Sequence, residues 1–164
     1  MLEYLEMMVL THKRARQVHN KKEADSWPYC CMEDFVLHFG EAFSFSELPS
    51  YIERGEMKQC FKNAYHLALS SPEHTYVEGF ACGVIPVMHA WCIDSKDQVV
   101  DPTWTDGREY YGVRFNLNYV NEVIEDKSTY GVIDNWEDRF PLLSGAHTVE
   151  HFGFPGRSVP TGSV

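Results

Sequence analysis

The sequence predicts an α+β domain in which helices pack against one antiparallel β-sheet. Three observations support this prediction. Helical periodicity marks the beginning and the middle of the chain, and β-branched and aromatic residues dominate residues 75–115. The connections between the predicted strands are too short for parallel crossovers. The length of 164 residues suits one domain over 1–164, since typical domains contain roughly 100–200 residues.

The first third of the chain predicts two helices. Residues 2–19 carry apolar side chains and His12 at three- and four-residue steps, which is typical of an amphipathic helix. Residues 32–39 predict a second, shorter helix that ends at Gly40. Residues 41–55 contain proline and glycine and are predicted to be irregular.

The middle of the chain predicts one helix followed by several strands. Residues 57–70 have one apolar face and predict a helix, which ends before Pro72 because proline and the residue before it disfavour helical geometry. Four segments rich in β-branched and aromatic residues follow: Thr75–Cys82, Val87–Ile93, Gln98–Asp101 and Tyr110–Phe115. Residues 94–97 predict the turn of a hairpin.

The last part of the chain predicts two more short helices, at Leu117–Glu125 and Trp136–Leu143. Residues 145–164 contain four glycines and two prolines, and we expect them to form an extended tail. Helices at both ends of a strand-rich centre complete the α+β pattern.

The charge balance argues against two classes of partner. The chain has 14 Lys+Arg and 24 Asp+Glu, which gives a net charge of −10. Binding to a nucleic acid backbone or to an anionic membrane surface requires a basic surface, so we expect neither as a partner. The content of 44% hydrophobic and 14% aromatic residues instead predicts a folded core, typical of an enzyme or a binding domain.

Several features favour a cytoplasmic location. No stretch approaches the roughly 18 apolar residues that a membrane span needs. The first six residues are acidic and lack the basic start of a signal peptide. The five cysteines form no even disulfide framework, so we expect reduced thiols, one of which could act as a nucleophile.

Cys60, His89 and Asp101 are the residues best placed for chemistry. A thiol nucleophile needs a base nearby and a group that orients the base. Cys60 lies in the first turn of a predicted helix, where the positive end of the helix dipole favours a thiolate. His89 and Asp101 lie on the two strands of the predicted hairpin.

The register of that hairpin decides whether His89 and Asp101 meet. An odd-numbered loop centred on Ser95 would place them directly opposite each other on one face of the sheet. An even-numbered loop would place them on opposite faces, and both registers agree with the sequence.

The same residues resemble the motifs of the transglutaminase-like superfamily. The resemblance consists of Cys60 at a helix start, His89-Ala90-Trp91 in a strand, and Asp101-Pro102-Thr103-Trp104 at the end of the next strand. The segment Tyr76–Ala81 is similar to the strand that the family places between its cysteine and its histidine. The similarity covers about residues 56–116, and the chain length suits a small bacterial or phage member.

The resemblance implies a papain-like fold with a Cys-His-Asp triad and acyl chemistry on amide bonds of a protein or peptide. Cys60 would be the nucleophile, His89 the general base and then acid, and Asp101 the residue that orients His89. Gln59 is a candidate second donor to the oxyanion, although the papain-like enzymes place that glutamine several residues upstream. Trp91 and Trp104 are predicted to be either core residues or walls of the cleft.

Other interpretations compete with the enzyme. Each triad residue taken alone is typical of a core or a turn, and the fold could serve as a non-catalytic protein-binding module. A zinc-binding structural domain is a third hypothesis. Its candidate ligands are Cys30-Cys31 beside His38 or His19, or a subset of Cys82, His89 and Cys92. The sequence has no C-x-x-C spacing and no glycine-rich phosphate loop, so it predicts no metal site and no cofactor.

Overall fold

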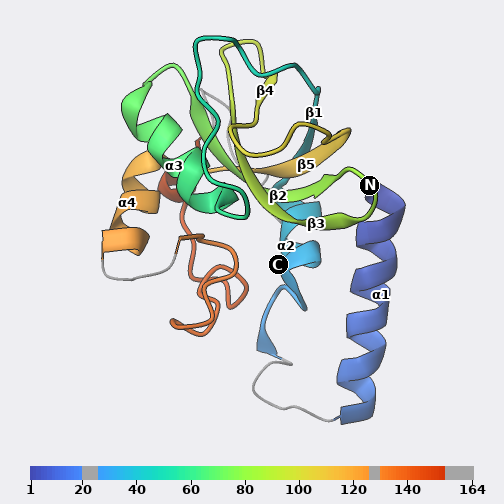
Figure 1. Cartoon of the computed structure of the whole chain (residues 1–164). Helices are drawn as coiled ribbons and strands as arrows, with labels where there is room; N and C mark the ends of the chain where they lie inside the picture. Colours follow the sequence, from blue (N-terminus) through green and yellow to red (C-terminus); the bar gives the residue numbers. More distant parts are fainter. Residues whose placement is uncertain (20–25, 126–129, 154–164) are drawn as a thin grey trace.

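The computed structural model describes residues 1–19, 26–125 and 130–153, and within them it is a mixed α and β structure (Figure 1). Four α-helices and five strands follow one another within these described ranges. They are α1 (Leu2–His19), α2 (Met32–Phe39), β1 (Glu41–Phe43), α3 (Cys60–Ser70), β2 (Thr75–Cys82), β3 (Pro86–Ile93), β4 (Val99–Val100), β5 (Glu109–Arg114) and α4 (Leu117–Glu125), with a 3₁₀ turn η2 (Val149–His151) near the end.

The five strands form one antiparallel sheet in the order β1-β5-β2-β3-β4. The sheet is curled so far that its two edges meet. Ser44, directly after β1, forms a bridge with Gln98, directly before β4. The Ser44 carbonyl also accepts a hydrogen bond of 3.0 Å from the Val99 N–H. The edge strands are therefore paired with each other at this point.

The two faces of the curled sheet bury two separate cores. The larger core lies between the sheet and all four helices, which surround its outer face in Figure 1. The smaller core lies inside the curl and is made of Phe43, Val77, Ala81, Trp91, Ile93, Val99 and Tyr110. Successive side chains of β3 point to opposite faces of the sheet, so Ala90 and Cys92 lie in the larger core and Trp91 and Ile93 lie in the smaller core.

Small side chains let α3 lie close to β3. Ala64 and Ala68 form one row of the helix and are fully buried, and they belong to the same core as Ala90 and Cys92 of β3. The Cys92 thiol donates a hydrogen bond of 3.2 Å to the Ala64 carbonyl. Cys60 continues the same row one turn earlier, because residues four apart share a helix face.

The structure confirms most predicted elements and corrects two in the first half of the chain. Strand β1 lies within the segment that was predicted to be irregular; its three residues pair with β5, which only tertiary packing provides. Helix α3 begins at Cys60 instead of residue 57. Lys58 has a φ of 68°, which lies in the left-handed region and prevents an earlier helical start.

The end of the chain also differs from the prediction. Trp136–Leu143 forms turns and no helix, because Arg139 and Phe140 have φ values of 57° and 53° and Pro141 follows them. Part of 145–153 packs on the domain instead of extending from it: Phe152 is buried and forms a bridge with Phe115, while 145, 146 and 148–150 are exposed. The remainder of the predicted tail, 154–164, lies outside the described residues.

Among the helices of the described residues, none is both long enough and apolar enough to cross a membrane.

Candidate active site

Cys60 is the first residue of α3, and its side chain is half-buried. The residue before it, Gln59, has φ −112° and ψ 37° and caps the helix without a side-chain hydrogen bond. The first N–H groups of an α-helix have no partner within the helix, so the Cys60 N–H can donate to a bound group. The thiol and a free backbone donor therefore lie at the same helix end.

His89 and Asp101 are in direct contact. The His89 Nε2 lies 2.7 Å from the Asp101 Oδ2, and the two side chains are 1% and 4% exposed. The Cys60 thiol lies close enough to the same imidazole to contribute to the raised pKa of His89. Because Nε2 faces Asp101, Nδ1 is the ring nitrogen that remains for Cys60. The structure thus brings the three predicted residues together in the order thiol, imidazole, carboxylate.

Asp101 is held by three further hydrogen bonds. Its Oδ1 accepts the backbone N–H groups of Thr103 and Trp104, at 2.8 and 3.0 Å. Its Oδ2 accepts the Tyr110 hydroxyl at 2.9 Å, in addition to the contact with His89. A carboxylate fixed at both oxygens gives the imidazole one preferred orientation.

These contacts determine the protonation of the pair. Burial by itself lowers the pKa of His89, but the hydrogen bond to Asp101 and the nearby Cys60 outweigh burial and raise the pKa to about 9. Burial raises the pKa of Asp101, and the hydrogen bond and charge of His89 reverse that effect and leave the pKa below its ordinary value. At neutral pH the pair is therefore an imidazolium and a carboxylate.

The hairpin register explains how His89 and Asp101 meet. Cys92 pairs with Val100 and Ile93 with Val99, so the loop has an odd number of residues and is centred on Lys96 instead of Ser95. His89 and Asp101 consequently share a face, as one of the two predicted registers requires. They are not directly opposite, because this register places His89 opposite Thr103, two residues beyond Asp101. The 2.7 Å contact is a diagonal one.

Tyr110 supports the site and was not predicted from the sequence. It lies in β5, remote in sequence from the hairpin, and its hydroxyl reaches Asp101 across the smaller core. Gly107 makes this possible, because a Cβ atom at that position would overlap the Tyr110 hydroxyl. No local pattern in the sequence reveals such a contact.

Asn63 connects the helix start to the loop of Asp101. Its side-chain amide donates to the Thr103 Oγ1 at 2.9 Å and to the Glu56 carbonyl at 2.8 Å. The neighbouring Gly55 N–H donates to the Pro102 carbonyl at 2.8 Å. These bonds agree with the interpretation of Asn63 as a residue that satisfies backbone groups, and they hold Cys60 against the loop that carries Asp101.

The two predicted cleft tryptophans have different environments. Trp91 is 0% exposed and belongs to the smaller core, so it is a core residue and not a cleft wall. Its packing against the sheet requires Gly112, where a Cβ atom would lie 2.6 Å from the indole ring. Trp104 is half-buried, and its ring centroid lies 4.3 Å from that of His89.

Trp104 lines two cavities beside the triad. One of about 320 Å³ is bordered by Met57, the β2–β3 turn, Thr103 and Trp104. The other, of about 270 Å³, is bordered by residues 45–48, Arg54, Asp101 and Trp104. The exposed apolar side chains of Val84 and Ile85 extend the first cavity outward.

Gln59 is exposed, and its backbone N–H donates to the Glu56 carbonyl at 3.3 Å. Its backbone donor is therefore used within the turn before α3. The side-chain amide is the only donor that Gln59 could offer to an oxyanion, and that role stays a prediction.

Comparison with known proteins gives no match. No family model, no curated protein and no solved structure matches the chain. The transglutaminase-like resemblance therefore depends only on the residues quoted from this sequence.

Glu78 is a second buried acid that sequence reasoning did not single out. It is 0% exposed in β2, and its carboxylate accepts hydrogen bonds from the Tyr76 hydroxyl and from the Val132 and Ile133 N–H groups at 2.7, 2.7 and 3.0 Å. Burial raises its pKa to about 7 against these bonds. The signal was available: Glu78 is the one charged residue in an otherwise apolar and aromatic strand.

Proposed function

We propose that this chain is a cysteine-dependent acyl-transfer enzyme with a transglutaminase-like, papain-like core. Its substrate is an amide group of a protein or peptide. The observation that carries the proposal is the 2.7 Å contact between His89 and Asp101, beside which the Cys60 thiol lies close enough to affect the pKa of the imidazole. An imidazolium beside a thiol favours the ionised, nucleophilic form of sulfur, and this arrangement is the one that nucleophilic catalysis needs.

The reaction follows from the positions of the three groups. The Cys60 sulfur attacks the amide carbonyl carbon and forms a C–S bond, while the carbonyl electron pair moves to oxygen. The Cys60 N–H stabilises this oxyanion, with the Gln59 amide as the candidate second donor. His89 gives its proton to the amide nitrogen, the C–N bond breaks, and a thioester remains.

The second half of the reaction releases the acyl group. Neutral His89 takes a proton from water or from a primary amine as that nucleophile attacks the thioester carbonyl. The C–S bond then breaks and the thiolate–imidazolium pair is restored. Water gives hydrolysis or deamidation, and a lysine amine gives transamidation. Asp101 keeps the imidazole oriented throughout both steps.

Selective alkylation tests the activation of Cys60. The protein is treated at neutral pH with substoichiometric iodoacetamide, and the labelled peptides are identified by mass spectrometry. We expect Cys60 to react first and to react much more slowly in His89→Ala. Cys82 is also half-buried and provides an internal control whose rate stays constant. Equal labelling of Cys60 and Cys82 in the wild type would contradict the proposal.

A turnover assay tests the reaction itself. A glutamine-rich unfolded protein is incubated with the enzyme, with and without a fluorescent primary amine. Ammonia release, amine incorporation and new peptide ends report the three outcomes separately. The control is Cys60→Ala. A reactive Cys60 that forms none of these products would favour the alternative, a protein-binding module that retains the fold.

A further inference from the structure

A second cluster of a thiol, an imidazole and a carboxylate lies between α1 and α2, apart from the candidate active site. His12 comes from α1, Cys31 is the N-cap residue of α2, and Glu33 lies in its first turn. One donor atom from each residue lies within 4.8 Å of the other two. The histidine of this cluster is neither His38 nor His19, which were the two candidates from the sequence. The side chain of His19 lies outside what the structure describes.

Glu33 is the unusual member of the cluster. It is 7% exposed, and among residues 1–19, 26–125 and 130–153 its carboxylate forms no ion pair. Its neighbour is the Cys31 thiol, 6% exposed, whose sulfur lies within 4.8 Å of a Glu33 carboxylate oxygen. A buried carboxylate beside a buried thiol is costly unless a cation compensates it.

We propose that His12, Cys31 and Glu33 bind one zinc ion. Zinc accepts nitrogen, sulfur and oxygen ligands together, at about 2.0–2.3 Å, and it is four-coordinate in most sites. The ion with a thiolate, a carboxylate and a neutral imidazole carries no net charge, which suits a site with two buried ligands. The anionic ligands also lie at the N-terminal end of α2, where the helix dipole stabilises negative charge.

The surroundings leave room for the fourth ligand. The three residues line a cavity of about 380 Å³, together with Cys30 and Trp27. A water molecule from this cavity can complete the tetrahedron. The Cys30 sulfur lies 3.7 Å from the Cys31 sulfur, so the thiols must be kept reduced in any measurement.

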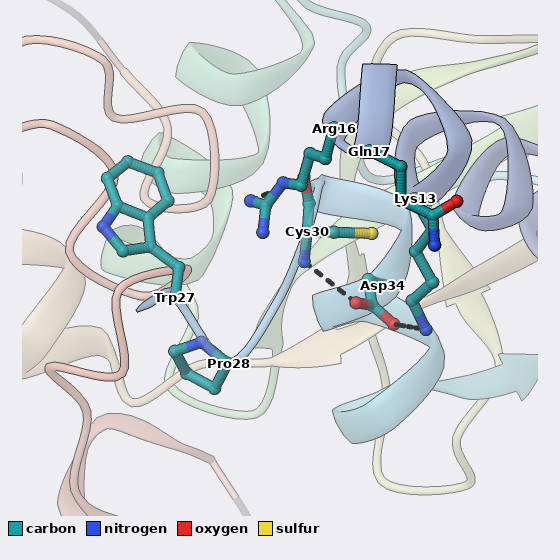
Figure 2. Close-up of a pocket in the computed structure, with 7 residues that line it drawn as sticks. All are labelled: Lys13, Arg16, Gln17, Trp27, Pro28, Cys30 and Asp34. Carbon is teal, nitrogen blue, oxygen red and sulfur yellow. Dashed lines mark hydrogen bonds and ion pairs between the residues drawn. The ribbon is translucent and has the colours of Figure 1, made fainter. Parts of the chain in front are cut away.

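The ion would fasten α1 to the rest of the protein. Only Leu5 and Val9 of the α1 side chains that the structure describes are buried, and His12 follows on the same helix face. Figure 2 shows the adjoining pocket, where Lys13 reaches Asp34 at 3.9 Å and Arg16 approaches the loop before α2. The Arg16 guanidinium donates to the Cys30 carbonyl at 3.1 Å. Zinc adds a third link between the same two segments.

Zinc titration of the full, reduced chain tests the proposal. Competition with a chromophoric chelator should give one bound zinc per chain, and His12→Ala should weaken binding by at least about tenfold. His12 is exposed, so this variant keeps its fold, which circular dichroism checks. The matched control is His38→Ala, an exposed histidine of α2 outside the cluster. A second control, Cys60→Ala, removes the candidate nucleophile and should leave binding unchanged.

Cobalt(II) provides an independent readout. We expect a near-ultraviolet thiolate-to-cobalt charge-transfer band that is absent in Cys31→Ser and retained in Cys60→Ala. Zinc should raise the melting temperature of the wild type and of His38→Ala, but not of His12→Ala. The proposal is overturned if zinc does not bind stoichiometrically, if His12→Ala binds as tightly as the wild type, or if binding depends on Cys60.

Discussion

The same three chemical groups occur at two places in this molecule and are arranged differently. At both places a cysteine lies at the start of a helix, Cys60 in α3 and Cys31 before α2. In the first site the imidazole is buried between the thiol and the carboxylate. In the second site the thiol and the carboxylate are buried and lie within 4.8 Å of each other, and His12 is exposed.

The difference shows that the arrangement of the three groups, and not their chemical identity, decides what each cluster can do. A buried histidine between sulfur and carboxylate can move a proton between the thiol and a substrate. Burial, together with the charge of Glu33, raises the pKa of Cys31, which disfavours the thiolate in the metal-free protein. The first arrangement suits nucleophilic catalysis, and the second suits metal binding.

Removing the sulfur of each site gives the largest contrast. We predict that Cys60→Ala abolishes turnover, while its free energy of unfolding stays within about 1 kcal/mol of the wild type, because Cys60 is only half-buried. Cys31→Ala should retain turnover and lose zinc binding. Turnover and thermal melts of both variants check this; full turnover by a folded Cys60→Ala would remove the enzymatic interpretation.

Neutralising the carboxylate of each site gives the next largest effect. Asp101→Asn should lower turnover about 10²–10⁴-fold, because an amide cannot hold a protonated imidazole as a carboxylate does. Glu33→Gln should leave the rate unchanged. The measurement is the rate over a range of pH, and an equal loss in both variants would mean that the comparison of the two sites is wrong.

Asp101→Ala should also reduce stability. Its carboxylate accepts four hydrogen bonds, so its loss leaves buried donors of His89 and Tyr110 unpaired and costs about 1–3 kcal/mol. Glu33→Gln in the metal-free protein should not reduce the free energy of unfolding, because it removes a buried carboxylate that has no ion pair among the described residues. Urea unfolding of both variants measures the difference. A more stable Asp101→Ala would contradict the assigned hydrogen bonds.

The pH dependence of stability tests the raised pKa of His89. The pKa of His89 is raised from 6.5 to about 9 on folding, so its contribution is complete below pH 6.5 and is lost as the pH rises through 9. The free energy of unfolding should fall over this window in the wild type and less steeply in His89→Gln. Parallel curves for wild type and His89→Gln would exclude the raised pKa.

The smallest expected effect concerns Tyr110. Tyr110→Phe removes one hydrogen bond to Asp101 and should cost about 0.5–1.5 kcal/mol. Turnover should decrease only slightly, because Asp101 keeps its backbone partners. Unfolding curves and rates for this variant show whether the third support of the carboxylate matters; a loss as large as that of Asp101→Asn would make Tyr110 a full member of the site.

Features encoded over short stretches could be predicted from the sequence. The helix periodicity of residues 2–19 and the β-branched residues of β2 and β3 gave bounds close to those observed. His89 and Asp101 could be paired because one hairpin connects them, although the loop centre was misjudged by one residue and the register by two. The helix start at Cys60 was placed three residues early, since the left-handed Lys58 leaves no mark in the sequence.

Contacts across the fold could not be predicted. Tyr110 reaches Asp101 through the smaller core, and Glu78 binds backbone groups more than 50 residues away. His12 meets Cys31 only because α1 packs on α2. Each of these contacts depends on how distant elements pack, and neither spacing nor periodicity carries that information.

The meeting of the sheet edges has a consequence for how a polypeptide can dock. Many peptide-binding proteins extend a free edge strand with the ligand as an additional strand. Here β1 and β4 contain three and two residues, and the backbone beside them is joined through Ser44 and Val99. Strand addition, both by a substrate and by another copy of the chain during aggregation, is disfavoured at this seam. A peptide must instead be held by side chains and loops such as those around Trp104.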